Sequence, residues 1–140
     1  MTDVKSFLLR VEKIDAVIEN KLKERKQWED MAYNITSSVG GERVQSSGGK
    51  NKVAEAIEKC IDTEAEIDRL IDKLIDAKKQ ATAAIEKLPN PTEYRVLHMR
   101  YIEGISLTDI AERCGREYTW VTTVHGRALK NLRDILDKNA

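Results

Sequence analysis

The sequence contains few residues of the kinds that build sheets, tight turns and disulfide frameworks. Of its 140 residues only 5% are aromatic, seven are glycine, two are proline and two are cysteine. Sandwiches and barrels need many turn residues and many β-branched or aromatic strand residues, so this composition favours helices. Cys60 and Cys114 lie far apart without neighbouring metal ligands. This spacing predicts two reduced cysteines.

Long apolar runs are missing as well. No segment approaches the roughly 18 consecutive apolar residues that a membrane-spanning helix requires. Near the start, Phe7-Leu8-Leu9 is flanked by Lys5 and Arg10, which is unlike the apolar core of a signal peptide. We therefore expect a cytoplasmic protein that contacts no membrane.

An excess of charge of one sign is also absent, because 24 basic residues balance 24 acidic ones. Neither half of the chain is a basic block of the kind that binds nucleic acid without selectivity. A local excess occurs near the C-terminus, where four basic residues between positions 116 and 133 face only Glu117: Arg116, Arg127, Lys130 and Arg133. Contacts with DNA phosphates would need such an excess, although an ordinary solvated surface gives the same pattern.

No residue set typical of catalysis is found in the sequence. The two histidines, His98 and His125, have no serine, cysteine or carboxylate at a spacing that indicates a catalytic triad or dyad. Asp68, Asp72 and Asp76 recur every four residues on one helical face, but basic residues lie between them, which is typical of a solvated charged face. We therefore expect no enzyme activity, no metal and no cofactor.

Residues 1–88 have the pattern of two long amphipathic helices. In the first, expected over residues 2–36, apolar residues such as Val4, Leu8 and Val11 recur at spacings of three and four. The segment 37–51 follows with two Gly-Gly and two Ser-Ser pairs, which predicts a flexible connection. A second long helix is expected over residues 52–88.

The second helix carries a heptad seam in which steps of four and three alternate. Its positions are apolar except for Glu64 and Lys78: Val53, Ile57, Cys60, Glu64, Ile67, Ile71, Leu74, Lys78, Ala81, Ile85 and Leu88. Such a seam needs a partner, which is either the first helix folded back as an antiparallel hairpin or a second subunit. Further apolar residues beside the seam, at positions 61, 70, 75 and 84, suit a four-helix bundle of two hairpins.

We therefore predict a homodimer or higher homo-oligomer through the N-terminal helices. The residues expected at that interface are Val53, Ile57, Ile67, Ile71, Leu74 and Ile85.

Pro89-Asn90-Pro91 marks the expected boundary between residues 1–88 and a second domain, residues 91–140. Neither proline can continue the long helix, whereas Pro91 suits the first turn of the next helix with Asn90 as its cap. That helix is expected to run from Thr92 to Glu103 and to end at Gly104.

The following residues have the pattern of a helix-turn-helix. Ser106 with Asp109 offers a capping box for a short helix, and Gly115 supplies the positive φ that a sharp turn between helices needs. A longer helix follows with an apolar stripe: Val121, Val124, Ala128, Leu129, Leu132 and Ile135. A short helix, a glycine turn and a longer helix are typical of a scaffold helix with a recognition helix.

This segment resembles region 4 of the primary-type (sigma-70) bacterial sigma factors. The "RYxEG-S-xx-IA" run of that family is matched by Arg100, Tyr101, Glu103, Gly104, Ser106, Ile110 and Ala111. Residues 127–133 resemble the family's basic tail, and Val121 matches the start of its recognition helix. Thr122 and His125 depart from the pattern, since family members often have a basic residue and a leucine there.

The rest of the chain does not resemble a sigma factor, because it has no candidate for the region that melts promoter DNA. The chain is similar to small phage and prophage transcription regulators of the RinA and ArpU type, which join a helical N-terminal segment to a sigma-like end. Residues 43–47 and 118–129 carry this narrower resemblance. It implies an all-α fold: a long N-terminal helical hairpin followed by a sigma region 4-like helix-turn-helix domain.

The expected DNA contacts lie at the start of the recognition helix, because that end enters the major groove. The residues that lead in or follow on its outer face are Arg116, Glu117, Tyr118, Thr119, Thr122, Thr123 and Gly126. Arginine can pair with guanine, glutamate can accept from cytosine, and threonine can contact the thymine methyl. Arg127 and Lys130 are expected to contact phosphates and set the register.

Two functions remain open at this point. The first is a sequence-specific transcriptional regulator that binds double-stranded promoter DNA. The second is an interaction protein whose sigma-like domain binds RNA polymerase or another transcription factor and has little DNA affinity of its own. Two roles are also open: Trp120 is a packing residue or a base contact, and His125 is a core residue or a phosphate donor.

Overall fold

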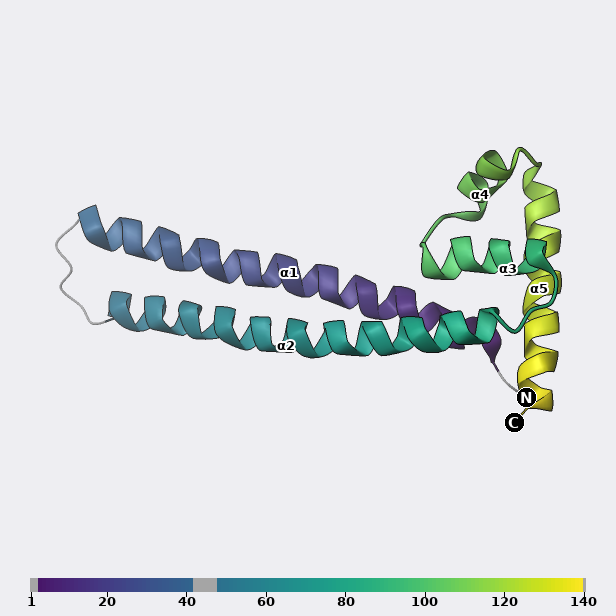
Figure 1. The fold of residues 1–140 in the computed structure, drawn as a ribbon. Coiled ribbons are helices and arrows are strands. Elements are labelled where there is room, and N and C mark those ends of the chain that lie inside the picture. The colour runs from purple at the N-terminus through teal and green to yellow at the C-terminus, as the bar shows by residue number, and fades with distance from the viewer. Residues whose placement is uncertain (1–2, 42–47, 140) are drawn as a thin grey trace. The chain divides into compact units, whose positions relative to one another are not determined.

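The computed structural model describes residues 3–41 and 48–139, and every regular element in these ranges is helical (Figure 1). The helices are α1 (Val4–Gly41), α2 (Gly48–Ile85), α3 (Pro91–Leu97), the π-helical η1 (His98–Ile102), α4 (Leu107–Cys114) and α5 (Tyr118–Lys138). The expected all-α fold, with a long N-terminal helix pair, is confirmed. Within the described ranges, no helix is both long enough and apolar enough to cross a membrane.

The long helices extend further into their connection than the sequence predicted, whereas α2 ends at Ile85, before the predicted end at residue 88. Residues 37–51 were expected to form a flexible connection, but α1 continues to Gly41 and α2 begins at Gly48. A helix that is already formed gains one hydrogen bond for each residue it adds, so it can continue into glycine and serine. Residues 42–47, which include the whole of the run at 43–47, lie outside the described residues.

Contacts divide the chain into two compact units whose limits differ from the boundary expected at Pro89. One unit comprises residues 15–73, and the other comprises residues 1–14 together with 74–140. The division therefore falls within α1 and α2. The first turns of α1 and the last turns of α2 belong to the same unit as the helix-turn-helix segment, which we call the C-terminal unit; residues 15–73 are the hairpin unit.

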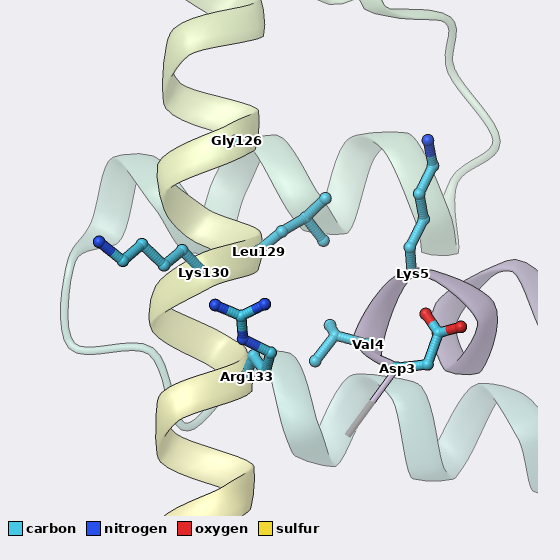
Figure 2. Close-up of a pocket in the computed structure, with 7 residues that line it drawn as sticks. All are labelled: Asp3, Val4, Lys5, Gly126, Leu129, Lys130 and Arg133. Atoms are coloured by element: carbon cyan, nitrogen blue, oxygen red, sulfur yellow. The ribbon is translucent and has the colours of Figure 1, made fainter. Parts of the chain in front are cut away.

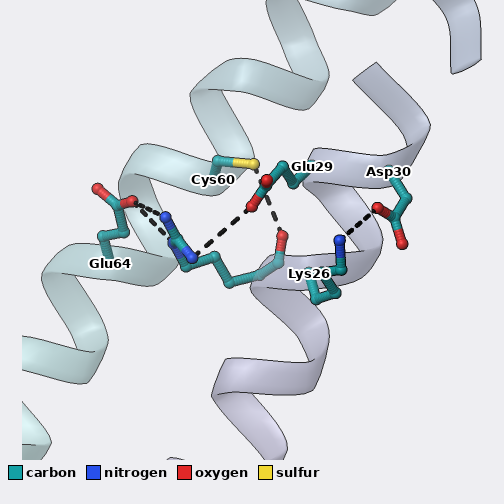
Figure 3. A network of polar contacts seen from close by, with 6 residues as sticks. Lys26, Glu29, Asp30, Cys60 and Glu64 are labelled. Carbon is teal, nitrogen blue, oxygen red and sulfur yellow. Dashed lines mark hydrogen bonds and ion pairs between the residues drawn. The ribbon is translucent and has the colours of Figure 1, made fainter. Parts of the chain in front are cut away.

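In the hairpin unit, α1 and α2 lie side by side and antiparallel (Figure 1). Ion pairs join the two helices, with 2.7 Å between Lys21 Nζ and Glu66 Oε2 and 2.7 Å between Arg25 Nη2 and Glu64 Oε1. Figure 3 shows the contacts around Glu64, where the thiol of Cys60 also donates to the carbonyl of Arg25 across 3.7 Å. The first helix thus supplies the partner that the seam of the second helix requires. Of the two alternatives, the antiparallel hairpin is the one that the structure contains.

The residues of α2 that face α1 differ in part from the predicted seam. At every second seam position, the residue that is buried lies one place earlier in the sequence than the predicted one. In the hairpin unit the buried and half-buried members of the seam are Val53, Ala56, Cys60, Thr63, Ile67 and Leu70, of which Val53, Cys60 and Ile67 are as predicted. Ile57 and Ile71, which periodicity placed in the seam, are 48% and 41% exposed. The prediction from periodicity favoured the bulkier Ile57 over its neighbour Ala56. The smaller residue is the one that is buried, because a small side chain lets two helices approach closely. Thr63 joins the seam because its hydroxyl donates to the carbonyl of Lys59 at 2.7 Å.

The C-terminal unit is organised around two apolar clusters. The first joins the start of α1 and the end of α2 to the later helices, with these buried residues: Val4, Leu8, Val11, Ala77, Ala81, Ala84, Ile85, Leu88, Leu97, Tyr101, Ala128 and Leu132. The second holds α3, η1, α4 and the start of α5 together, through Val96, Met99, Ile110, Ala111, Val121 and Val124. Two of the predicted interface residues, Leu74 and Ile85, pack in or against the first cluster.

The segment after α2 follows the expected capping but not the expected helix type. Asn90 caps α3, since its side chain accepts from the backbone N–H groups of Thr92 and Glu93 at 2.9 and 3.2 Å. The predicted helix over 92–103 is α-helical only to Leu97 and then forms the π turn η1, in which the N–H of Glu103 donates to the carbonyl of His98 at 3.1 Å. Gly104 ends it with φ +73°.

Candidate nucleic-acid interface

Helix α4 and the turn after it are built by local capping. The Ser106 side chain accepts from the N–H of Asp109 at 3.2 Å, which fixes the start of α4. Gly115 adopts φ +64°, and its N–H donates to carbonyls in the last turn of α4. A side chain at Gly115 would be strained by that φ. The sequence therefore predicted this turn correctly.

Helix α5 begins at Tyr118 and packs along one face. Its buried residues Val121, Val124, Ala128 and Leu132 recur at spacings of three and four, as expected. Val121 and Val124 pack in the second cluster with Ile110 of α4. This contact holds the first turns of α5 against the scaffold, so that the opposite face of α5 is open to solvent.

Two buried polar contacts fix α5 against the preceding helices. The hydroxyl of Tyr101 lies 2.7 Å from Nε2 of His125, and the Asn131 amide donates to Glu93 at 2.9 Å. Burial, and then the positive charges of Lys5 and Arg100, lower the pKa of His125 from its ordinary 6.5. Burial raises the pKa of Tyr101 above 10.0. At neutral pH the tyrosine is therefore protonated and the imidazole is neutral, and the tautomer of the imidazole sets which of the two groups donates.

His125 is thus a packed residue in this structure. It is half-buried, and its ring stacks on Tyr101 at a centroid distance of 5.6 Å. Of the two roles that the sequence left open, the geometry supports the core role.

The predicted DNA-contacting residues gather at the start and on the outer face of α5. Thr122 is half-buried, and the others are exposed: Arg116, Glu117, Tyr118, Thr119, Thr123, Gly126, Arg127 and Lys130. All of them lie in or directly before one helix, so a single groove of DNA could meet them together. Glu117 provides the N-cap position without a side-chain hydrogen bond, so its carboxylate is free of a capping role.

The threonines of this face present their methyl groups. The hydroxyls of Thr122 and Thr123 both donate to the carbonyl of Thr119, at 3.0 and 2.8 Å. Because their hydroxyl protons are used inside the helix, each side chain offers a partner its methyl group and an acceptor oxygen. A methyl group is suited to contact with the methyl of thymine.

Arg116 and Trp120 form a pair beside the turn. The Arg116 guanidinium carbon lies 4.9 Å from the centroid of the Trp120 ring, which is within cation–π range. Trp120 is half-buried and packs against the second cluster. Packing, the first of the two roles open for Trp120, is what the structure supports. Arg116 remains exposed at the edge of the face and is oriented by the ring.

Sequence reasoning missed two cationic residues near this face. Arg133 was counted in the basic excess but not assigned to the site, and Lys5 belongs to α1. Both line a hollow beside Gly126 on α5 (Figure 2). Periodicity within α5 could not reveal that α1 begins here, because that contact joins residues more than 120 positions apart. The signal that remained in the sequence was the glycine inside a helix.

No family of proteins, characterised protein or solved structure that was compared with this chain matches it. The function is therefore argued from the residues and their arrangement.

Proposed function

We propose that this protein is a transcriptional regulator of the phage or prophage type that binds promoter DNA sequence-specifically through the α4–α5 helix-turn-helix. The observation that carries the proposal is the outer face of α5. Its exposed residues combine a bidentate donor (Arg116), an acceptor (Glu117) and threonine methyl groups with two cations for phosphates (Arg127 and Lys130). This is the set of contacts by which a recognition helix reads a major groove.

The scaffold supports this role because α5 is held rigidly. Its buried face is packed in two clusters, and the Tyr101–His125 and Asn131–Glu93 hydrogen bonds fix its rotation. A rotation of α5 by one residue would turn the outer face by about 100°. A helix that contacts base edges needs a fixed rotation about its own axis, because hydrogen bonds to base edges depend strongly on direction.

The experiment is the selection of DNA sites from a random duplex library by the full chain, followed by binding measurements on the selected duplex. Arg116→Ala and Thr122→Ala are expected to change the preferred bases, with a loss of about 1–3 kcal/mol of discrimination for a bidentate arginine contact. Lys130→Ala is expected to weaken binding to all duplexes equally and to reduce the salt dependence by about one counterion.

The two classes of variant control each other, because one changes sequence preference and the other changes affinity alone. Equal loss of affinity for all three variants with no change in preferred bases would contradict the assigned roles. If no duplex is selected but the chain is retained by RNA polymerase, the protein is instead an interaction protein with a sigma-like domain. Zero net charge is the observation that favours this second candidate.

We further propose that the hairpin unit joins two copies of the chain. Ile57 and Ile61 are 48% and 60% exposed, and each follows a seam residue, Ala56 or Cys60, by one position. One position corresponds to about 100° around a helix, and a helix in a four-helix bundle uses two apolar faces separated by about that angle. A second copy would cover the isoleucines and place two helix-turn-helix segments on one DNA.

A further inference from the structure

A hollow lies between the first turn of α1 and the outer face of α5, entirely within the C-terminal unit. It has a volume of about 460 Å³ and is lined by Asp3, Val4 and Lys5 of α1 and by Gly126, Leu129, Lys130 and Arg133 of α5. Figure 2 shows Leu129 projecting from α5 toward the start of α1, with Lys5 and Arg133 on either side of the space. Lys130 extends from the outer side of α5. Val4 and Leu129 give the hollow an apolar floor.

The residues that line this hollow carry a net positive charge, since three are basic and one is acidic. Lys5, Lys130 and Arg133 form no ion pair with any residue that the structure describes. The one acid, Asp3, is engaged by Ser6, whose N–H and hydroxyl donate to its carboxylate at 3.1 and 2.8 Å. Asp3 therefore caps α1 and keeps its negative charge, which offsets one of the three cations, so the lining has a net positive charge that a partner can use. An anion is the ligand that this arrangement fits.

Gly126 is a second and independent indication of a ligand. It lies in the interior of α5, where glycine is less favourable than alanine. Its φ is not positive, and a Cβ built at this position meets no atom within 4 Å. Nothing inside the protein therefore requires a glycine here. Glycine in a helix without an internal reason allows the close approach of a ligand to the backbone.

We propose that this hollow holds a backbone phosphate of the DNA duplex that α5 reads, with the phosphate against Gly126 and between Lys5 and Arg133. The site extends the DNA interface from the helix-turn-helix to the first turn of α1. It rests on the proposed DNA-binding function and adds to it residues from the opposite end of the sequence. Lys130, on the outer side of α5, meets the neighbouring phosphate.

Lys5→Gln tests the contribution of α1, and Lys13→Gln is the matched control. Lys13 is an exposed lysine two turns further along α1 and does not line the hollow. Binding of the full chain to its selected duplex is measured by fluorescence anisotropy over a range of salt concentrations. Lys5→Gln is expected to lower the salt slope by about 0.9 and to weaken binding up to about eightfold at 0.1 M salt. Lys13→Gln is expected to leave both quantities unchanged.

Gly126→Ala tests the close approach separately from charge. The added methyl group meets open space in the free protein, and alanine favours the helix, so the thermal midpoint is expected to stay the same or rise. The same variant is expected to weaken duplex binding by at least threefold, because the methyl group occupies the place of the phosphate. Loss of affinity with full stability cannot be produced by unfolding.

The outcomes separate this site from the proposed function. If the wild-type chain binds no duplex, the proposed function fails. If it binds, and Lys5→Gln and Lys13→Gln have the same salt slope, or Gly126→Ala binds as the wild type does, the phosphate site is overturned. A thermal-shift titration with inorganic phosphate distinguishes the source of the anion. Stabilisation that Lys5→Gln abolishes, with duplex binding unchanged, would show a site for a free anion and would overturn the assignment to DNA.

Discussion

The two units of this protein bury their apolar residues to different extents. The largest fully buried side chains all belong to the C-terminal unit: Leu8, Ile85, Leu97, Ile110, Leu132, Val96 and Val121. The hairpin unit buries the smaller set Ile18, Ala56, Thr63 and Ile67, and it leaves large apolar residues such as Ile61 and Tyr33 at 60% and 72% exposed. The C-terminal unit therefore builds its core within one chain, whereas the hairpin unit has an apolar surface that none of the described residues covers.

The largest difference between the units is expected from truncation of a core residue. Leu132 is fully buried in the first cluster of the C-terminal unit. Leu132→Ala is expected to lower the free energy of unfolding by about 2–5 kcal/mol, because it removes buried methyl groups and leaves a cavity. Chemical denaturation followed by circular dichroism measures this value. Ile71→Ala, at a residue 41% exposed, is the comparison in the hairpin unit and is expected to cost clearly less.

A smaller effect is expected from the buried imidazole of the C-terminal unit. Burial and the charges of Lys5 and Arg100 lower the pKa of His125 in the folded protein below 6.5, so the unfolded chain binds the proton more readily. Stability from this group is therefore present above pH 6.5 and is lost as the pH falls through the lower, folded-state pKa. Thermal midpoints measured from about pH 7.5 to about pH 5 are expected to fall less in His125→Gln than in the wild type. Parallel curves for the two proteins would contradict this assignment.

The smallest effect on the stability of the single chain is expected at the exposed isoleucines. Ile57→Asp with Ile61→Asp is expected to change the free energy of unfolding of the monomer by less than about 1 kcal/mol, because both residues are largely exposed. The same double variant is expected to dissociate the assembly, as measured by sedimentation equilibrium. Lys59→Asp is the control for charge, because Lys59 is exposed on the opposite face of α2, two positions from each isoleucine, and this change alters the net charge by as much as the double variant does. A wild-type chain that sediments as a monomer would refute the proposed dimer.

The helical fold could be predicted from the sequence because periodicity and capping act locally. Asn90, Gly104, Ser106 and Gly115 all occupy the cap or turn positions that their chemistry predicts. The register of the seam between α1 and α2 could not be predicted in the same way. Ala56 and Ile57 compete for the same place in a heptad, and only the close approach of α1 decides that the smaller residue is buried.

The candidate site was predictable where it lies on a single helix. The outer face of α5 can be predicted from the spacing of Val121 and Val124. These residues are buried, so the opposite face of the helix is the exposed one. The hollow beside Gly126 was not predictable, since it also requires the start of α1. The role of His125 likewise depends on Tyr101, which lies 24 positions earlier. Tertiary partners of this kind leave no periodic signal in the sequence.

The π turn of η1 changes the angular position of the residues that follow it. A π turn holds one residue more than an α turn of the same length, so residues beyond it are out of phase with α3 by one position. Tyr101 reaches His125 and Arg100 reaches Glu12, at 2.7 and 3.2 Å, from within this widened turn. Deleting one residue between His98 and Ile102 would restore an unbroken α-helix but would rotate Tyr101 away from α5. The extra residue thus acts as a spacer that sets the angular position of Tyr101 against α5.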